Sequence, residues 1–470
     1  MSLIVMKFGG TSVGGAAAIE ALAAITREQQ AMWEQVVLVV SAMSGVTDML
    51  IQGARTAADG DPVTYSEIAR RLREKHATAL AELVGAAGGT LKEGSDVGAE
   101  VERLIGEFEL LCHSVNVLGE VSPRALDAIS GLGERMSARV VAATLRARGI
   151  PAEALDATEL VVTTGHFGNA IPLQPQTRER IRARLIPLLD AGVVPVVTGF
   201  IGATENGVAT TLGRGGSDYS GAIVGAALDA DEVAIYTDVD GVMTADPRLA
   251  PEAHVIAALS FNEMSELAYF GAKVLHPRAV RPVVERDIPL RIRNTFNSAH
   301  AGTLVVQQLE PDGRAIKAVT SIKGMSMITV EGRGMIGVPG VAARTFGAVA
   351  GAGANVLMIS QASSEQSICF VVPMASSAAV VGALDDGLAN ELARRDVDRI
   401  AARDGVVIVT AVGAGMRDTP GVASMVFGAL AERRINVVAI AQGSSESAIS
   451  LVVGADDADD AVRAIHALTI

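Results

Sequence analysis

The chain has 470 residues, nearly half of them apolar, few aromatic residues and a formal net charge of −14. This length predicts roughly three domains, whereas the acidic balance and scarce aromatic side chains argue against nucleic-acid binding. The two cysteines, Cys112 and Cys369, lack metal-ligand spacing and fit a reducing compartment. Neither a signal peptide nor a run of about 20 apolar residues is present, so we expect a cytoplasmic protein that binds no membrane.

The chain begins with a short apolar strand and a glycine turn. Residues 4–6 predict a buried strand, and Lys7, Phe8, Gly9 and Gly10 follow it directly, before a helical stretch. Glycines between a strand and a helix allow backbone N–H groups to approach a phosphate. Because the lysine precedes the glycines, the spacing is neither the Walker pattern nor the dinucleotide fingerprint. An isolated lysine at a strand end would be expected in solvent, but beside these glycines we predict that Lys7 contacts phosphates.

The next segments predict a second strand and an inserted helical hairpin. Residues 36–40 are apolar and mostly β-branched, and Ser41 and Thr47 lie in the loop that follows them. Thr47 also fits an N-cap of the next helix. Residues 64–120 have heptad-like apolar spacing with charges between, which predicts a helical hairpin inserted in the first domain. Glu134 comes after it at a plausible helix start, where acidic residues are common because they complement the helix dipole.

The most informative segment, residues 210–221, lies between a predicted strand at 193–198 and a helix of small residues. It combines backbone freedom, a cation, a hydroxyl and a carboxylate in one turn, in the residues Arg214, Gly215, Gly216, Ser217 and Asp218. A helix start attracts negative charge, and an arginine can hold a carboxylate with two parallel hydrogen bonds. A solvated turn is the simpler interpretation, but this many glycines cost conformational entropy unless the turn binds something. We therefore predict a site for a small anionic molecule.

An apolar strand predicted at residues 233–237 opens into an acidic loop with a terminal arginine. Asp238 lies at the start of this loop and Arg248 at its end. Carboxylates in such a loop suit Mg²⁺-bound waters or nucleotide hydroxyls, and the arginine suits a phosphate.

Residues 1–300 alternate continuous apolar strands with helical stretches. Strands without polar alternation are typical of a parallel sheet covered on both faces. This part of the chain therefore predicts a three-layer α/β/α domain with a mostly parallel sheet. Residues 299–314, which contain glycine and proline, predict the passage to a second region.

The second region contains an internal repeat at a constant offset of 81 residues. Within it Asn355 corresponds to Asn436, and Gln361 corresponds to Gln442. Two solvent-facing glutamines would be the simpler interpretation. Because each glutamine precedes the same Ser-Ser-Glu sequence after one residue, we predict that both bind a ligand.

Each repeat predicts a small α+β module, one at residues 315–400 and one at 401–470. The second copy ends after its last helix and lacks one strand of the four that such a module needs. A spare strand at residues 315–322 precedes the first copy. We hypothesise that this strand completes the sheet of the second module, which makes the first module an insertion within it.

In this order, the motifs resemble those of the aspartate kinases in the amino-acid kinase family, and the repeat resembles paired ACT domains, which are ferredoxin-like modules that bind amino acids. The resemblance is carried by residues 7–13, 41–47, 133–137, 213–218, 237–238, 246–248 and 271–277. It implies transfer of the γ-phosphoryl group of ATP, with Mg²⁺, to the β-carboxylate of L-aspartate. That reaction gives 4-phospho-L-aspartate and begins lysine, threonine and methionine synthesis.

The resemblance also implies roles for individual residues. Lys7 would stabilise the transition state, and Asp218 would orient Lys7 and help to keep it charged. The residues expected to contact ATP are Lys7, Phe8, Gly9, Gly10, Ser41, Thr237, Asp238, Met243, Arg248 and Lys273. Those expected to bind aspartate are Thr47, Glu134, Arg214, Gly215, Gly216 and Ser217. No side chain is expected to ligate a metal directly.

Two of these residues have competing interpretations. Met243 departs from the family pattern, because many relatives have tyrosine there, although a thioether can still pack against a base. Lys273 could instead be a lysine near a helix C-terminus that interacts with the helix dipole.

For the ACT pair, the resemblance implies that Asn355, Gln361, Asn436 and Gln442 bind an amino-acid effector. Threonine is favoured, because the glutamine pattern is found in relatives fused to homoserine dehydrogenase, and lysine is the rival. Paired ACT domains also imply a homodimer or a larger assembly.

Two other functions remain open at this point. One is a kinase for another acidic substrate, such as glutamate or N-acetylglutamate. Glu134 and Arg214 favour a free α-amino acid, and the ACT repeat favours aspartate. The other is a catalytically inactive amino-acid sensor. The intact residues Lys7, Arg214, Asp218 and Asp238 argue against it.

Overall fold

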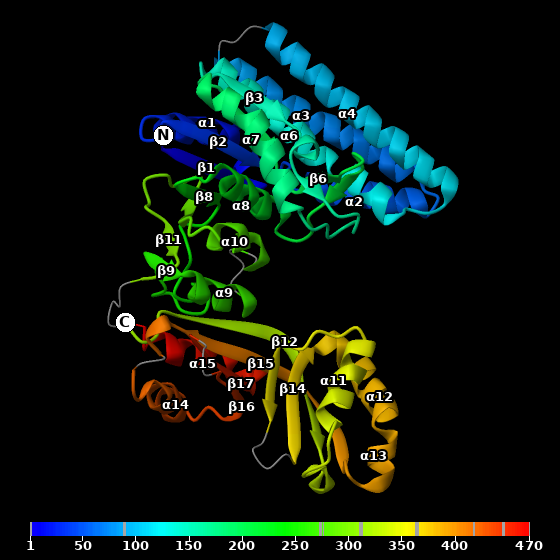
Figure 1. Cartoon of the computed structure of the whole chain (residues 1–470), viewed down its shortest axis with the longest axis vertical. Helices are drawn as coiled ribbons and strands as arrows, with labels where there is room; N and C mark the ends of the chain where they lie inside the picture. The colour runs from blue at the N-terminus through cyan, green and yellow to red at the C-terminus, as the bar shows by residue number, and fades with distance from the viewer. Residues whose placement is uncertain are drawn as a thin grey trace. The chain divides into compact units, whose positions relative to one another are not determined.

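The computed structural model describes residues 2–87, 91–271, 275, 277–309, 314–361, 366–416, 419–443 and 447–469, which fall into two compact units (Figure 1). The first unit contains Met1–Val242, Ala257–Phe261 and Val274–Leu309, and the second contains Met243–Ile256, Asn262–Lys273 and Glu310–Ile470. The acidic loop that follows the strand at 233–237 is therefore divided between the units, with Asp238 in the first and Arg248 in the second.

An eight-stranded sheet, as far as the described residues show, forms the centre of the first unit. Its order is β3-β5-β2-β1-β8-β10-β11-β9, and neighbours are parallel except β10 and β11. The strands are β1 (Leu3–Phe8), β2 (Gln35–Val40), β3 (Ala152–Leu155), β5 (Val194–Thr198), β8 (Glu232–Thr237), β9 (Ala258–Ser260), β10 (Leu290–Asn294) and β11 (Thr303–Val306). Strand β1 is buried along its whole length, as expected for a central strand covered on both faces.

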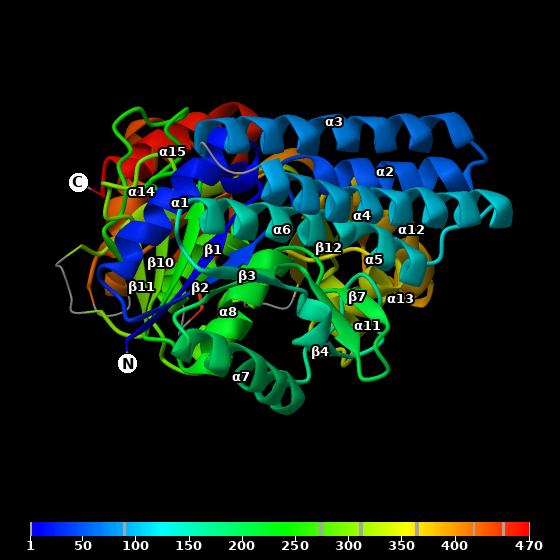
Figure 2. The ribbon, with the colours of Figure 1, turned by 90° about the horizontal axis from the view of Figure 1, so that it is seen from above.

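Helices cover both faces of this sheet. Helices α1 and α6 lie on one face and α7 and α8 on the other (Figure 2). The helices of this unit, apart from the hairpin described next, are α1 (Ala16–Gln30), α2 (Val46–Ala58), α5 (Pro123–Ser130), α6 (Leu132–Ala147), α7 (Gln174–Asp190), α8 (Gly216–Leu228) and α10 (Pro277–Val284). The predicted three-layer α/β/α fold with a mostly parallel sheet is confirmed.

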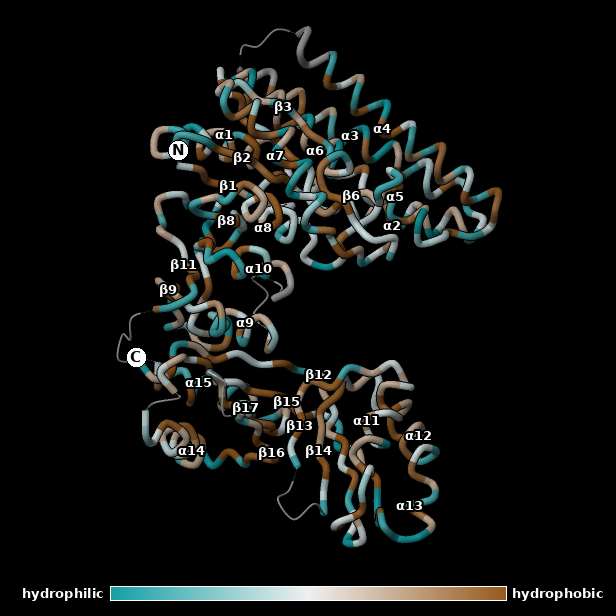
Figure 3. Tube along the Cα trace, viewed as in Figure 1, coloured by the Kyte–Doolittle hydropathy of each residue, from teal (hydrophilic) through white to brown (hydrophobic). Residues whose placement is uncertain are grey.

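Two long helices, α3 (Pro62–Ala87) and α4 (Leu91–Leu118), lie side by side in the region where the hairpin was expected (Figures 1 and 2). Hydrophobic and hydrophilic residues alternate along them, in contrast to the mainly hydrophobic sheet strands (Figure 3). Their apolar sides join the core of the sheet domain through residues such as Ile68, Leu72, Leu104 and Phe108. The hairpin is thus anchored by burial of one face of each helix.

A small sheet of order β4-β6-β7 lies directly before the glycine loop, residues 213–216. Its strands are β4 (Val162–Thr163), β6 (Ile201–Thr204) and β7 (Ala209–Thr211). Strands β6 and β7 are antiparallel, and β7 leads through the glycine loop into α8.

The second unit contains a six-stranded antiparallel sheet of order β13-β14-β12-β15-β17-β16, again within the described residues. The strands are β12 (Ala318–Glu331), β13 (Met358–Gln361), β14 (Ser367–Pro373), β15 (Arg399–Val412), β16 (Val437–Ala441) and β17 (Ala448–Gly454). The helices are α9 (Phe261–Tyr269), whose first residue still belongs to the first unit, α11 (Val341–Gly351), α12 (Ser377–Gly387), α13 (Ala389–Arg394), α14 (Val422–Glu432) and α15 (Ala458–His466). This is the α+β region that the repeat predicted.

Strands β12 and β15 are long, and each contributes to the sheets of both repeats. Ala318 to Ile322 pair with Ile408 to Val412 of β15, whereas the later part of β12, from Met325, pairs with β14 and with the early part of β15. This is the pairing that the hypothesis of a completed second sheet requires. The expected module boundary at residue 401 falls inside β15, because one continuous strand leaves the first module and enters the second.

Among the described helices, none has both the length and the apolar character that a membrane crossing requires.

Candidate active site

One cavity of about 540 Å³ in the first unit brings together most of the residues predicted to bind ATP or aspartate. It lies at the carboxyl ends of β1, β2 and β8 and at the N-terminus of α8, the edge at which open α/β sheets bind ligands. The predicted residues that line it are Lys7, Gly9, Gly10, Ser41, Thr47, Glu134, Arg214, Gly215, Gly216, Ser217, Asp218, Thr237 and Asp238.

Lys7 and Asp218 form a close ion pair in this cavity. Lys7 Nζ lies 2.6 Å from Asp218 Oδ1, and both side chains are largely buried. Lys7 is the penultimate residue of β1, and Asp218 is in the first turn of α8. The two elements approach closely because residue 221 is glycine, since a Cβ there would lie 3.0 Å from Cβ of Lys7. The pair fixes an ammonium group at the end of the sheet, where a phosphate would meet it.

Glu134 is a buried carboxylic acid with one oxygen left unpaired. Its Oε1 accepts a hydrogen bond from the backbone N–H of Ala42 at 3.1 Å, while Oε2 has no partner among the described residues. Burial raises the pKa of Glu134 to about 8, although the Ala42 N–H and the charge of Lys7 act in the opposite direction. A buried acid with an unsatisfied oxygen in a cavity is suited to binding a cationic group.

The backbone around Glu134 is shaped for this approach. A Cβ on Gly133 would lie only 2.7 Å from Cβ of Ala42, so glycine is needed where the loop after β2 passes over the start of α6. The N-cap of α2 is Gly45, which leaves Thr47 in the first turn of α2 rather than at the N-cap.

Arg214 and Ser217 lie at the start of α8. Gly215 is the N-cap residue in the left-handed conformation, with φ 68°, and no side chain caps this helix. Arg214 is exposed, and its guanidinium has no hydrogen-bond or ion-pair partner among the described residues. An uncapped helix start and an unpaired guanidinium lining one cavity favour a carboxylate or phosphate ligand.

Thr237 and Asp238 close the opposite side, at the end of β8. Thr237 Oγ1 donates to Asp238 Oδ1 at 3.2 Å, and the carbonyl of Thr237 accepts from the N–H of Thr295 at 2.9 Å. The loop is braced further by Asn294, which donates to Asp240 at 2.8 Å.

Among the described residues, three that were predicted to contact ATP do not line this cavity. The side chain of Phe8 is fully buried and stacks on Tyr236 with ring centroids 4.6 Å apart. Met243 and Arg248 belong to the second unit, where Arg248 is exposed and pairs with Asp246 at 2.6 Å. Lys273 lies outside the described residues.

The N–H of Gly9 is also engaged by the protein itself, because it donates to the carbonyl of Tyr236 at 3.0 Å. The same holds for Gly216, whose N–H donates to the carbonyl of Gly213 at 2.9 Å. Gly9 and Gly216 therefore shape the turns and do not offer their N–H groups to a ligand. A ligand would have to bind other N–H groups of the same loops.

Several lining residues escaped the sequence reasoning, among them Thr11, Ser44, Asp48 and Phe200. Thr11 and Ser44 lie inside the motifs at residues 7–13 and 41–47, and Asp48 directly follows the second, so a complete reading of the two motifs could have found them. Phe200 has a positive φ of 67°, which is a strained conformation for a non-glycine residue. No local sequence pattern predicts it.

Asp127 supports the glycine loop from behind. This buried carboxylate accepts hydrogen bonds from the N–H of Gly168 at 2.9 Å, the N–H of Thr211 at 2.9 Å and the hydroxyl of Thr211 at 2.8 Å. Thr211 ends β7, two residues before Gly213. Asp127 thus fixes the strand from which the loop with Arg214 departs.

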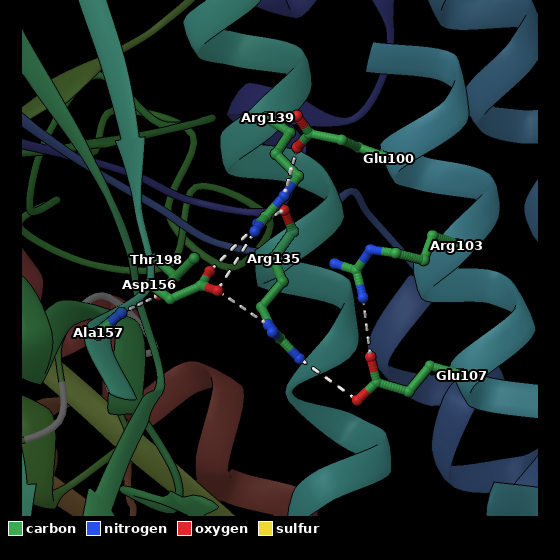
Figure 4. A network of polar contacts seen from close by, with 8 residues as sticks. All are labelled: Glu100, Arg103, Glu107, Arg135, Arg139, Asp156, Ala157 and Thr198. Atoms are coloured by element: carbon green, nitrogen blue, oxygen red, sulfur yellow. Dashed lines mark hydrogen bonds and ion pairs between the residues drawn. The ribbon is translucent and has the colours of Figure 1, made fainter. Parts of the chain in front are cut away.

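A polar network holds α6, the helix of Glu134, between the sheet and the hairpin (Figure 4). Arg135 and Arg139 both donate to Asp156, at 3.1 Å, and also pair with Glu107 and Glu100 of α4. Burial alone would raise the pKa of Asp156, but the two guanidinium groups bring it below its usual value. Glu134 is therefore carried by a helix fixed on both sides.

The comparisons with known proteins agree with this geometry. A model of the amino acid kinase family matches residues 2–294, and a model of the ACT domain matches residues 328–388 and 409–468. Chloroplastic aspartokinase 2 of Arabidopsis thaliana is 30% identical over 473 residues, which cover 98% of this chain and 83% of the relative. The chain belongs to the aspartokinases of the amino acid kinase family.

Solved and bifunctional aspartokinases extend this result. The crystal structure of E. coli aspartokinase III in complex with aspartate and ADP matches with a TM-score of 0.80 and 30% identity over 99% of each chain. The bifunctional aspartokinase/homoserine dehydrogenase 1 of Arabidopsis thaliana is 38% identical over 473 residues, 99% of this chain but 51% of the relative. The chain thus spans about half the length of the bifunctional aspartokinases that it matches.

The first ACT module contains a second cavity, of about 340 Å³. Gln361 lines it from the end of β13, together with residues 337–342 at the start of α11. Gly340 is the N-cap of α11, with φ 88°, and no side chain caps the helix. Gln361 therefore lines a cavity beside an uncapped helix start, an arrangement that is chemically suited to an anionic group.

The other three predicted effector contacts of the ACT modules have different positions. Asn355 is exposed and does not line this cavity. Asn436 and Gln442 flank β16 and are exposed as well.

Proposed function

We propose that this protein is an aspartate kinase that transfers the γ-phosphoryl group of ATP to the β-carboxylate of L-aspartate, giving ADP and 4-phospho-L-aspartate. The observation that carries the proposal is the unpaired buried oxygen of Glu134 in the same cavity as the exposed Arg214 and the Lys7–Asp218 pair. The complex of the E. coli relative with aspartate and ADP supports the choice of ligands.

Glu134 and Arg214 together suit a free α-amino acid. Ionised Glu134 would accept hydrogen bonds from the substrate ammonium, and Arg214 would hold its α-carboxylate with two parallel bonds. Thr47 and Ser217 line the same cavity and would add hydroxyl contacts. An N-acetylated substrate lacks the ammonium group, so it would leave the buried Glu134 without a cationic partner.

The chemistry required of this chain is positioning and charge stabilisation. The attacking β-carboxylate carries no proton to remove, so no general base is needed, and Asp218 serves to orient Lys7 through their ion pair. Lys7 would lie against the transferring phosphoryl group, whose negative charge spreads over its oxygens in the transition state. Uncapped N–H groups at the start of α8 would add to this stabilisation.

The nucleotide is expected on the side of Thr237 and Asp238, with Ser41 and Gly10 toward its phosphates. Mg²⁺ bound to these phosphates supplies further positive charge in such reactions. No group of three or more His, Cys, Asp or Glu side chains suited to a metal occurs among the described residues, so the phosphates and water would provide most of its ligands.

A coupled assay with ATP and hydroxylamine, which traps an acyl phosphate as a hydroxamate, tests the proposal. We expect product with L-aspartate and none above background with L-glutamate or N-acetyl-L-glutamate. Activity with another amino acid alone would select the kinase of a different acidic substrate, and activity with none would select an inactive amino-acid sensor.

Feedback inhibition through the ACT pair is the second part of the proposal, with threonine as the favoured effector and lysine as the rival. None of the described residues that line the cavity at Gln361 is charged, which suits an effector with a neutral side chain better than one with a second ammonium group. The match to bifunctional relatives with homoserine dehydrogenase is consistent with this choice. An assembly of at least two chains through the ACT modules and a place at the start of lysine, threonine and methionine synthesis complete the proposal.

Calorimetric titration of the protein with threonine and with lysine tests the effector. Saturable heat with threonine alone would support the favoured choice. Heat with lysine alone would replace threonine by lysine, and no heat with either would remove the regulatory claim.

A further inference from the structure

The first unit contains another cavity, of about 600 Å³, that the proposed reaction does not use. One face of α3 forms a wall of this cavity, with Arg71 and Lys75 one helical turn apart. The first turn of α1, beginning at Gly15, and the loop that contains Ser44 and Gly45 form other walls. All the residues that line it lie in the described part of the first unit.

The two cations on α3 have no close ion-pair partner among the described residues, although the charge of Arg71 also acts on Glu67, one helical turn away. Neither Arg71 nor Lys75 has a hydrogen-bond or ion-pair partner among the described residues, whereas the neighbouring Arg70 pairs with both Glu67 and Glu74. Glu74 is thus already engaged. Like charges four residues apart on one helix repel each other, so an anion between them would be stabilising.

Two helix N-termini add positive potential to the same cavity. Helix α1 begins at Gly15, with no capping side chain and no acidic residue in its first turn. Helix α2 begins at Gly45, also without a capping side chain, and its one acidic first-turn residue, Asp48, lines the active-site cavity instead. Uncapped N–H groups and the helix dipoles attract anions at both positions.

The geometry of the helices places Lys75 near the start of α2. Helices α2 and α3 are joined by a short turn and pack against each other, and a Cβ on Gly53 of α2 would lie 3.6 Å from Cδ1 of Ile68 on α3. The two helices run antiparallel, and each residue advances a helix by the same distance along its axis. Gly45 lies eight residues before Gly53, so it lies at about the same height as residue 76, eight residues after Ile68 on α3. The remaining acidic lining residue, Glu82, lies about 10 Å further along the axis of α3 than Lys75.

We propose that this cavity is a binding site for a small anion that carries a phosphate or carboxylate group, held by Arg71, Lys75 and the N-termini of α1 and α2. The site would communicate with the active site through one loop, because Met43, Ser44 and Gly45 line both cavities. Binding would fix this loop, next to Thr47, and thereby change the KM for aspartate. The effect on KM rests on the proposed function, whereas the binding itself does not.

Calorimetric titration with inorganic phosphate and, separately, with malonate tests the site. The variants are Arg71→Ala with Lys75→Ala, the control Arg70→Ala on the same helix, and Lys7→Ala in the active site. Alanine favours the helix at the exposed or half-buried positions 70, 71 and 75 of α3, and circular dichroism verifies the fold of each variant. We expect the double variant to weaken binding of at least one probe by about tenfold or more, and Arg70→Ala and Lys7→Ala to leave that binding within about twofold.

The outcomes distinguish a phosphate ligand from a carboxylate ligand, and they test the anion site independently of the proposed kinase activity. Phosphate binding alone identifies a phosphoryl ligand, and malonate binding alone identifies a carboxylate ligand. Binding that survives the double variant but is lost in Lys7→Ala belongs to the active site and overturns the inference, as does the absence of binding of either probe to the unsubstituted protein. A failed kinase assay with intact phosphate binding would reject the proposed function and leave this site standing.

Kinetics give the second measurement. In an active enzyme, the bound anion should shift the KM for aspartate at least about twofold at saturating ATP, and this shift should vanish in the double variant. An equal shift in both proteins would overturn the proposed communication.

Discussion

The active-site cavity and the cavity of the first ACT module share one local structure, an uncapped helix start, but differ in the side chains that line them. Both lie at an uncapped helix start with a left-handed glycine N-cap, Gly215 of α8 and Gly340 of α11. The active-site cavity adds Lys7, Glu134 and Asp218, largely buried charges or potential charges, whereas the described residues around the ACT cavity are uncharged. The difference matches the two proposed roles, because an uncapped helix start suits a carboxylate, while phosphoryl transfer requires fixed charges around the transferring group.

The largest effect is expected from removing the ammonium group of the active site. Lys7→Ala should lower kcat at least about a hundredfold, because one preorganised contact to the transferring group is lost. The control Lys323→Ala removes an exposed lysine of the second unit, which pairs with Asp459, and should leave kcat within about twofold. Steady-state kinetics measure both, and a near-normal kcat for Lys7→Ala would reject the role of this residue.

Glu134 tests whether the buried acid serves substrate binding. Glu134→Gln keeps the size of the side chain and the bond to Ala42 but removes the charge, so KM for aspartate should rise about tenfold to a hundredfold. Kinetics at saturating ATP measure this change. An unchanged KM would show that the substrate ammonium lies elsewhere.

The raised pKa of Glu134 also predicts a pH dependence of opposite sign for stability and for binding. The folded protein keeps this proton up to about pH 8, whereas the unfolded chain loses it near pH 4.5, so the contribution of Glu134 to stability falls as pH rises between these values. Aspartate needs the ionised form, so its affinity should increase toward pH 8, by at most about tenfold per pH unit. Denaturant unfolding and calorimetry at several pH values measure the two trends.

Glu134→Gln supplies the control for both trends, because an amide does not titrate. The variant should lose the Glu134 part of the stability slope and the rise of aspartate affinity with pH. Identical pH profiles in the variant and the unsubstituted protein would contradict the assignment of this pKa.

Asp127→Asn probes the support of the glycine loop. An asparagine in this position cannot accept from both backbone N–H groups and the Thr211 hydroxyl with the same strength, because an amide has one oxygen and no charge. We expect kcat/KM for aspartate to fall about tenfold, mostly through KM, since the loop that carries Arg214 would lose its support from Asp127. Equal losses of kcat and stability with an unchanged KM would indicate a general structural role instead.

The smallest effect on catalysis is expected in the ACT cavity. Gln361→Ala and its counterpart Gln442→Ala should blunt inhibition by the effector and leave kcat within about twofold, because neither residue lies in the active-site cavity. Inhibition curves with threonine and with lysine measure this. Unchanged curves for both variants would remove the regulatory role of the glutamines.

Residues such as Lys7, Arg214 and Glu134 were predictable because their motifs join a chemical group to a strand end or a helix start, and such ends meet at one edge of a parallel sheet. Phe8 shows the limit of this reasoning. It lies inside a motif, yet alternation along β1 turns its ring into the core, where it stacks on Tyr236.

Other features depend on contacts between distant segments and have no local signal. Phe200 is held in a strained conformation beside Gly216, and Arg248 follows a strand of one unit but belongs to the other. In the repeat, the strand order could be inferred from counting, but the continuity of β15 across both modules could not, because a repeat boundary need not coincide with a strand end.

A crystal structure with ADP and L-aspartate tests the central claim most directly. The account predicts the terminal phosphate of ADP on the side of Lys7, the α-carboxylate of aspartate on Arg214 and its ammonium on Glu134. Both ligands bound away from these three side chains would contradict it.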